Sequence, residues 1–245
     1  MLRCVIWDID GTVAETERDG HRVAFNLAFA SLGLPWRWDI EHYGGLLGVT
    51  GGYERLLFDM QARPDAPPTA DEREGLAREL HRRKNRYYTG EVLAGGMPLR
   101  PGVRELMDEC AEQGVKLGIA TTTGRANVDA LLRGALGAGW RARFDAVVCA
   151  EEAPLKKPHP QVYRLALQQL ECAPGDAVAV EDAPNGLAAA QAAGIPTLVT
   201  RSLYFRNGTF DAALAVCDDL TWPQRVSLDL LRRWLQRWQP AMASR

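Results

Sequence analysis

The sequence predicts an α/β protein, with a doubly wound, Rossmann-like parallel sheet into which a helical domain is inserted. From residue 99 onward, short apolar runs alternate with segments of helical periodicity, which is typical of a parallel sheet with helices on both faces. The run Cys4-Val5-Ile6-Trp7 also predicts a buried strand. The block that follows it, up to about residue 90, has helical patterns and no convincing strand. We therefore expect a core domain of residues 1–16 and 90–245 and a helical cap domain of residues 17–89.

Periodicity, proline and glycine place the remaining elements. Apolar residues at helical spacing predict cap helices over 21–32, 53–61 and 71–88. In the core, Pro101 is expected to start a helix that Gly114 ends. The elements expected after it are strands over 115–120, 144–149, 177–180 and 197–200, and helices over 126–132, 159–170 and 184–193. The tail over 228–238 is expected to form an amphipathic, Trp-rich helix that docks on the core rather than on a partner.

Composition and charge exclude several classes of protein. The 245 residues suffice for a core with a smaller companion domain, and their 47% hydrophobic and 24% charged content is ordinary for a globular protein. A net charge of −2 gives no basic field for nucleic acid or an acidic membrane. Five cysteines without C-x-x-C spacing favour a reducing compartment. We expect a monomeric, cytoplasmic protein without a membrane span or a signal peptide, because an acidic motif already begins at residue 8.

That motif, Asp8-Ile9-Asp10-Gly11-Thr12, is the most informative feature of the chain. Residues two apart on an extended chain point the same way, so Asp8 and Asp10 are expected to offer two carboxylates to one place. Such a pair suits a hard cation such as Mg²⁺. It also suits a division of labour between a nucleophile and a general acid/base. The alternative is a strand followed by an ordinary Asp-Gly turn.

Three other expected strands also end in polar residues that suit phosphate chemistry. The first runs into Thr121-Thr122-Thr123-Gly124, where hydroxyls and free N–H groups either bind an anion or cap the next helix. The second is followed by Lys156-Lys157, which offers charge to a phosphate unless this is merely a solvated basic loop. The third ends in Glu181-Asp182, which could complete a cation site with Asp8 or cap a helix. Ligands bind at the carboxyl ends of strands in such sheets, so these groups are expected at one site.

Together these stretches resemble the haloacid dehalogenase superfamily of aspartate-nucleophile phosphotransferases over nearly the whole chain. The matching stretches are Asp8-Ile9-Asp10-Gly11-Thr12, Ile119-Ala120-Thr121-Thr122, Lys157-Pro158-His159-Pro160 and Val180-Glu181-Asp182-Ala183-Pro184-Asn185-Gly186. The resemblance implies that Asp8 is the nucleophile and Asp10 the general acid/base. Family dehalogenases lack the second aspartate, so Asp10 indicates phosphoryl transfer. The resemblance also implies a phosphoryl group held by Thr121, with Thr122 beside it, and by Lys157, and Mg²⁺ bound by Asp8, the Asp10 carbonyl and Asp182, with Glu181 beside it.

A closer resemblance is to the CbbY-like branch, near β-phosphoglucomutase, whose CbbY-type members dephosphorylate xylulose 1,5-bisphosphate. The strings that carry it are Ala14-Glu15-Thr16-Glu17-Arg18-Asp19-Gly20-His21-Arg22, Trp38-Asp39, Val49-Thr50-Gly51-Gly52, Glu54-Arg55 and Ala120-Thr121-Thr122-Thr123. By this resemblance, Glu17 and His21 contact the sugar, and Thr50-Gly51-Gly52 forms the specificity loop. Relatives usually carry a lysine where this chain has Tyr53, so Arg55 and Lys84 are the cap cations expected to hold a distal phosphate.

The implied activity is therefore that of a Mg²⁺-dependent phosphatase, a phosphoric monoester hydrolase whose partner is a small sugar phosphate. Three alternatives remain open at this point, and one of them is a phosphatase for a different small phosphate monoester. A sugar phosphomutase of the β-phosphoglucomutase kind would use the same residues but return the phosphoryl group to sugar. A phosphosugar-binding protein without activity would have no need of a nucleophile such as Asp8, or of Asp10, Lys157 and Asp182 around it. The sequence does not separate monophosphate from bisphosphate substrates.

Overall fold

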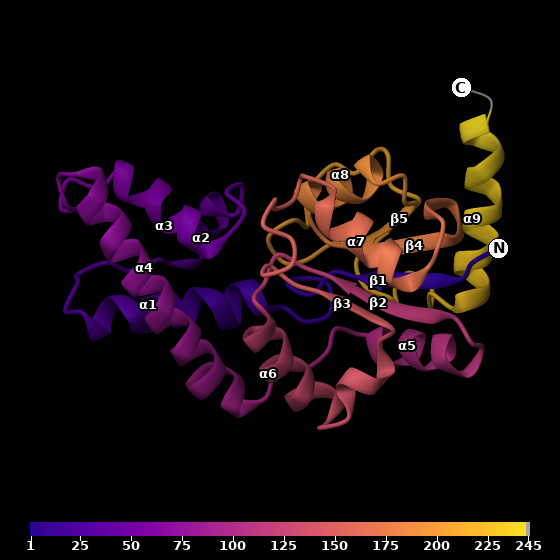
Figure 1. Ribbon diagram of the computed structural model, residues 1–245, viewed down its shortest axis with the longest axis horizontal. Helices are drawn as coiled ribbons and strands as arrows, with labels where there is room; N and C mark the ends of the chain where they lie inside the picture. Colours follow the sequence, from indigo (N-terminus) through magenta and orange to yellow (C-terminus); the bar gives the residue numbers. More distant parts are fainter. Residues whose placement is uncertain (244–245) are drawn as a thin grey trace.

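The core of the protein is one six-stranded parallel sheet with the strand order β3-β2-β1-β4-β5-β6 (Figure 1). A computed structural model describes residues 1–243. The strands are β1 (Cys4–Trp7), β2 (Lys116–Ala120), β3 (Ala146–Val148), β4 (Ala177–Glu181), β5 (Thr197–Thr200) and β6 (Ala215–Cys217). β1 pairs in parallel with both β2 and β4, so the strand that carries the acidic motif lies in the middle of the sheet. The order changes direction beside β1, which is where ligands bind in sheets of this kind.

Helices cover both faces of this sheet, as a doubly wound fold requires. The helices of the core are α5 (Val103–Glu112), α6 (Arg125–Leu136), α7 (Gln161–Leu170), α8 (Pro184–Ala192) and α9 (Leu228–Ala243). The side chains of β1 alternate between two apolar clusters, with Val5 and Trp7 packing towards α5, α6 and α9. Cys4 and Ile6 pack towards α7 and α8. This alternation is the period of two that a strand buried on both faces shows. The expected fold class is confirmed.

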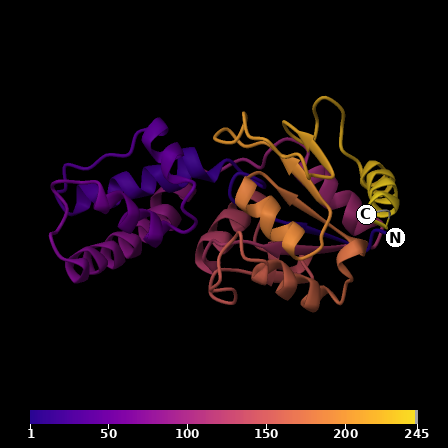
Figure 2. The same ribbon diagram turned by 90° about the horizontal axis from the view of Figure 1, so that it is seen from above.

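Residues 17–92, which lie between β1 and α5, form a helical lobe beside the sheet, called the cap below (Figures 1 and 2). Its helices are α1 (Arg22–Ser31), α2 (Ile40–Leu46), α3 (Gly52–Gln61) and α4 (Ala70–Tyr87), with π-helical turns at Glu17–His21 and Tyr88–Val92. The cap has its own apolar core, in which Phe25, Phe29 and Trp38 pack together. Residues 17–92, all of them described, contain no strand, as expected.

Two elements escaped prediction, and one expectation about the tail is confirmed. The short helix α2 contains Gly44 and Gly45, which weaken any helical pattern. The edge strand β6 has only three residues. The tail forms α9, whose Leu228, Leu231 and Leu235 are buried in the same cluster as α5. Within the described residues, no helix is long and apolar enough to cross a membrane.

Candidate active site

The carboxyl ends of β1, β2 and β4 open into a cavity of about 690 Å³ that both the core and the cap line. Asp8 follows β1 directly, and Glu181 and Asp182 stand at the end of β4, its hydrogen-bonded neighbour. Lys157 reaches the same place from the loop between β3 and α7. The structure therefore gathers at one edge of the sheet the acidic and basic groups that the strand ends had indicated.

The ammonium group of Lys157 contacts three of the groups at the base of this cavity. Lys157 Nζ lies 2.6 Å from Asp8 Oδ1 and 2.6 Å from Glu181 Oε1, and it donates to the Ala120 carbonyl at 2.9 Å. Tyr163 Oη donates a further hydrogen bond to Glu181 Oε1. Burial alone would lower the pKa of Lys157, but the Asp8 and Glu181 carboxylates outweigh it and raise that pKa. Lys157 is therefore charged at every working pH.

The carboxylates outnumber this one cation. Ligand oxygens of Asp8, Glu181 and Asp182 lie within 4.8 Å of one another, and all three side chains are buried. Burial raises the pKa of Asp8 to about 7, with Lys157 opposing the shift and Glu181 adding to it. Burial and the two neighbouring carboxylates raise the pKa of Asp182 well above its usual value. An all-oxygen donor set with surplus negative charge fits a hard divalent cation.

Two glycines allow these carboxylates to pack directly against the backbone. A Cβ on Gly11 would lie 2.2 Å from Asp182 Oδ2, and the φ of +84° at Gly11 also favours glycine. A Cβ on Gly186 would lie 1.9 Å from Glu181 Oε2. Any other residue at either position would displace a carboxylate of the cluster.

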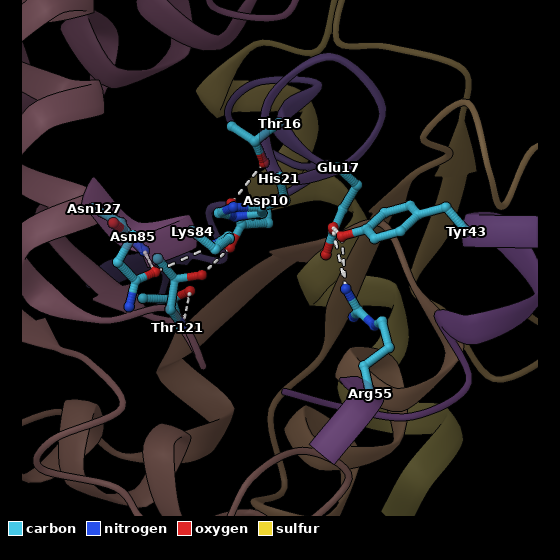
Figure 3. Close-up of polar contacts among 11 residues, drawn as sticks. Asp10, Thr16, Glu17, His21, Tyr43, Arg55, Lys84, Asn85, Thr121 and Asn127 are labelled. Atoms are coloured by element: carbon cyan, nitrogen blue, oxygen red, sulfur yellow. Dashed lines mark hydrogen bonds and ion pairs between the residues drawn. The ribbon is translucent and has the colours of Figure 1, made fainter. Parts of the chain in front are cut away.

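Asp10 lines the same cavity but has a separate set of partners (Figure 3). Thr16 Oγ1 donates to Asp10 Oδ1 at 2.5 Å, and His21 Nε2 lies 2.9 Å from the same oxygen. Thr123 Oγ1 donates to the other oxygen, Oδ2. Burial would raise the pKa of Asp10, but His21 and the three hydrogen bonds lower it below its usual value. The two aspartates of the motif are thus held differently, Asp8 by an ammonium and Asp10 by a histidine and two hydroxyls.

The cap contributes two cations to the cavity, Arg55 and Lys84, and a carboxylate lies close to Arg55. Arg55 Nη1 donates to Tyr43 Oη at 2.6 Å and lies 3.6 Å from Glu17 Oε2, and Tyr43 Oη in turn donates to Glu17 (Figure 3). Lys84 lies over the rings of Phe25 and Tyr88, at 5.4 and 4.9 Å. Within the described part of the chain, the hydrogen bond that its ammonium donates is a long one, 3.4 Å, to Asn85 Oδ1. Burial lowers the pKa of Lys84 to about 8, with Asp10 and Glu17 opposing the shift.

Some of the other predicted residues line the cavity, and others are packed in the protein around it. Thr50, Gly51 and Gly52 line the cavity, as does Thr122. Thr121 is nearly fully buried, and its hydroxyl accepts a hydrogen bond from the Thr123 backbone N–H at 3.2 Å. The Tyr53 ring packs against the apolar core of the cap.

Sequence reasoning missed Tyr43, His81, Asn85 and Asn127, which line the cavity or hold its groups in place. It placed Thr123 and Lys156 in polar segments at the strand ends, but it did not predict the contacts that they make with Asp10 and Glu54. Thr16, Glu54 and Asn185 stand in the strings that carry the resemblance, without a role of their own. Most of the others meet only when the cap lies on the core, as when Asn127 Nδ2 donates to Asn85 Oδ1 at 3.2 Å. Contacts between residues so far apart along the chain leave no local pattern.

Comparisons with known proteins show the family to which the chain belongs. The family model of haloacid dehalogenase-like hydrolases matches residues 2–194. The plasmid-encoded protein CbbY of Cupriavidus necator is 43% identical over all of this chain and 96% of its own length. Hexitol phosphatase B of Escherichia coli (strain K12) is 39% identical over 81% of this chain and 83% of its own length.

Two solved structures of CbbY from Rhodobacter sphaeroides are also similar, each with 38% sequence identity. The complex with phosphate has a TM-score of 0.86 and covers 95% of this chain and 100% of that one. The complex of a mutant with xylulose 1,5-bisphosphate has a TM-score of 0.84 and covers 91% of this chain and 96% of that one. The family model matches most of the chain and the relatives are similar over most of their length, so the chain belongs to the haloacid dehalogenase-like hydrolases.

Proposed function

We propose that this protein is a Mg²⁺-dependent sugar-phosphate phosphatase that works through a phospho-Asp8 intermediate, with a sugar bisphosphate such as xylulose 1,5-bisphosphate as its substrate. The observation that carries the proposal is the cluster of Asp8, Lys157, Glu181 and Asp182 at the floor of a cavity that the cap covers. The phosphate and bisphosphate complexes of the related CbbY support the same substrate class.

Asp8, Asp182 and the Asp10 carbonyl, with Glu181 beside them, are the groups that would hold the metal ion. Mg²⁺ bound there would neutralise charge on the phosphate oxygens, which otherwise repel an anionic nucleophile. Lys157 contributes to the same neutralisation from the protein, because its ammonium already lies 2.6 Å from the Asp8 oxygen.

The chemistry then follows from the two aspartates. A carboxylate oxygen of Asp8 attacks the phosphorus, and the bond from phosphorus to the sugar oxygen breaks. For this step Asp10 has to carry a proton, although its contacts in the protein without substrate favour the ionised form, and it gives that proton to the sugar oxygen. In the second half, ionised Asp10 takes a proton from water, whose oxygen attacks phospho-Asp8 and releases inorganic phosphate. The contacts from His21, Thr16 and Thr123 stabilise the ionised form that this second half requires.

The distal phosphate of a bisphosphate would need cations of its own, because burying an unpaired dianion is costly. Lys84 and Arg55 line the cavity from the cap. Glu17 already balances Arg55, whereas no carboxylate forms an ion pair with Lys84 within residues 1–243. Lys84 is therefore the stronger candidate for this phosphate, and Arg55 supports it. Tyr53 is directed into the cap's apolar core and takes no part.

A phosphate-release screen across sugar mono- and bisphosphates tests the proposal. We expect release from xylulose 1,5-bisphosphate that requires Mg²⁺ and is lost in Asp8→Asn. Arg55→Ala should raise KM for the bisphosphate more than for xylulose 5-phosphate. Formation of an isomerised monophosphate instead of free phosphate would favour the phosphomutase alternative. Turnover by Asp8→Asn above a trace would contradict the mechanism.

A further inference from the structure

An ion pair joins the cap to the core at the mouth of the cavity. Lys156 Nζ, in the core loop just before Lys157, lies 2.5 Å from Glu54 Oε1 on cap helix α3. Both residues line the cavity. Among residues 1–243, neither forms another ion pair. A hydrogen bond crosses the same seam nearby, since Asn185 Nδ2 donates to Thr50 Oγ1 at 3.1 Å.

The backbone of the cap loop lies directly against this ion pair. A Cβ on Gly51 would be 2.1 Å from Glu54 Oε2 and 2.5 Å from Lys156 Nζ. Gly51 also has a φ of +102°, which other residues rarely adopt. Glu54 Oε2 is buried and without a hydrogen-bond partner in the described structure. The loop, the carboxylate and the lysine thus close on one another at a single point, and moving the cap away would separate Lys156 from Glu54 and Gly51, which both belong to the cap.

We infer that Glu54 and Lys156 form an ionic clasp, which holds the cap against the core and so sets how much of the protein has a closed cavity. In this role both are positioning residues: they act through the cap rather than on the reacting atoms. The side chains are 42% and 27% exposed, so the ion pair is partly screened by water and its effect is modest. Removing either charge should shift the open–closed equilibrium about twofold to fivefold.

Hydrogen–deuterium exchange of the protein without substrate tests this directly, whatever reaction the protein catalyses. Glu54→Gln and Lys156→Gln should each speed amide exchange in residues 49–55 and 183–187 by about twofold to fivefold. The double variant should add little to either single one, because each removes the same interaction. A charge swap, Glu54→Lys with Lys156→Glu, should restore protection. The matched control is Glu74→Gln, which removes an ion pair of 3.2 Å with Arg78 within cap helix α4 and should leave the seam unchanged.

Unchanged exchange in both single variants would overturn the clasp, and so would additive effects in the double variant. The activity measurement rests on the proposed function: KM for the sugar bisphosphate should rise by the same factor in Glu54→Gln and Lys156→Gln. A rise in Lys156→Gln alone would mean that Lys156 binds substrate instead, which also contradicts the clasp. If no sugar phosphate is hydrolysed, the proposed function fails, and the exchange experiment still decides for or against the clasp.

Discussion

Replacing Asp8, the proposed nucleophile, should make the metal-free protein more stable. Asp8 is buried beside two other carboxylates and one ammonium, and its pKa is raised from 3.8 to about 7. The folded state therefore holds a proton there that the unfolded chain has already lost between these two pH values. Stability falls as pH rises through this window, and above it the charged Asp8 costs the fold about 4 kcal/mol. Asn resembles the protonated carboxyl group in shape and carries no charge, so Asp8→Asn should avoid that cost.

The assay is urea unfolding with a chelator present, for wild type and Asp8→Asn, from pH 4 to pH 8. Near pH 4 the two proteins should be close in stability, and by pH 8 the variant should be more stable by up to about 4 kcal/mol. For a chain of this length, that corresponds to roughly 8–16 °C in melting temperature. A variant that is less stable at pH 8, or a difference that does not change with pH, would refute the electrostatic reasoning.

Mg²⁺ provides the control for the same experiment. A cation bound to the cluster of Asp8, Glu181 and Asp182 should stabilise the wild type by about 2.7 kcal/mol at 100 times its dissociation constant. Asp8→Asn removes one ligand, so Mg²⁺ should stabilise this variant less than the wild type. Added Mg²⁺ should therefore reduce the difference in stability between the two proteins at pH 8. Equal stabilisation of both proteins would place the metal ion elsewhere.

Three further predictions concern residues around the cluster. Asp10→Asn should slow sugar phosphates by about 10²–10⁴-fold and p-nitrophenyl phosphate less, since that leaving group hardly needs a proton; equal slowing would argue against general acid/base catalysis. The pKa of Lys84 is lowered to about 8, so kcat/KM for the bisphosphate should fall above that pH, and Lys84→Arg should move the fall to higher pH. If the pH dependence of kcat/KM were the same in Lys84→Arg as in the wild type, the decrease at high pH would come from another group. Arg100→Met should cost more than about 3 kcal/mol in urea unfolding, because the buried guanidinium donates to the carbonyls of Gly11, Thr200, Arg201 and Asp218; a loss below 1 kcal/mol would contradict this.

The floor of the site could be predicted from the sequence because each group there follows a strand of the sheet directly. A buried apolar strand fixes where Asp8 begins, and the parallel pairing of β1 with β2 and β4 brings the strand ends together. The cap side could not be predicted in the same way. His21 of the cap contacts Asp10 of the core, and the Glu54–Lys156 pair between the two spans 102 positions. Such contacts depend on how two separately packed lobes meet, and local periodicity carries no information about that.

The same structural device recurs at three places in the site, and it connects the floor to the seam. At Gly11, Gly186 and Gly51, a carboxylate occupies the volume that a Cβ would fill, belonging to Asp182, Glu181 and Glu54 respectively. Close approach to the backbone limits where each of these acidic side chains can lie, in addition to the hydrogen bonds that Glu181 and Glu54 accept from lysines. Two of these carboxylates belong to the acidic cluster that could hold a metal ion, and the third pairs with the lysine next to Lys157. The loop that carries Lys157 is therefore held by acidic groups on both sides, by Asp8 and Glu181 in the core and by Glu54 in the cap. A movement of the cap would act on Lys156, which is one residue from the ammonium that pairs with Asp8, and on His21, which contacts Asp10 directly, so the seam is joined to both aspartates of the motif.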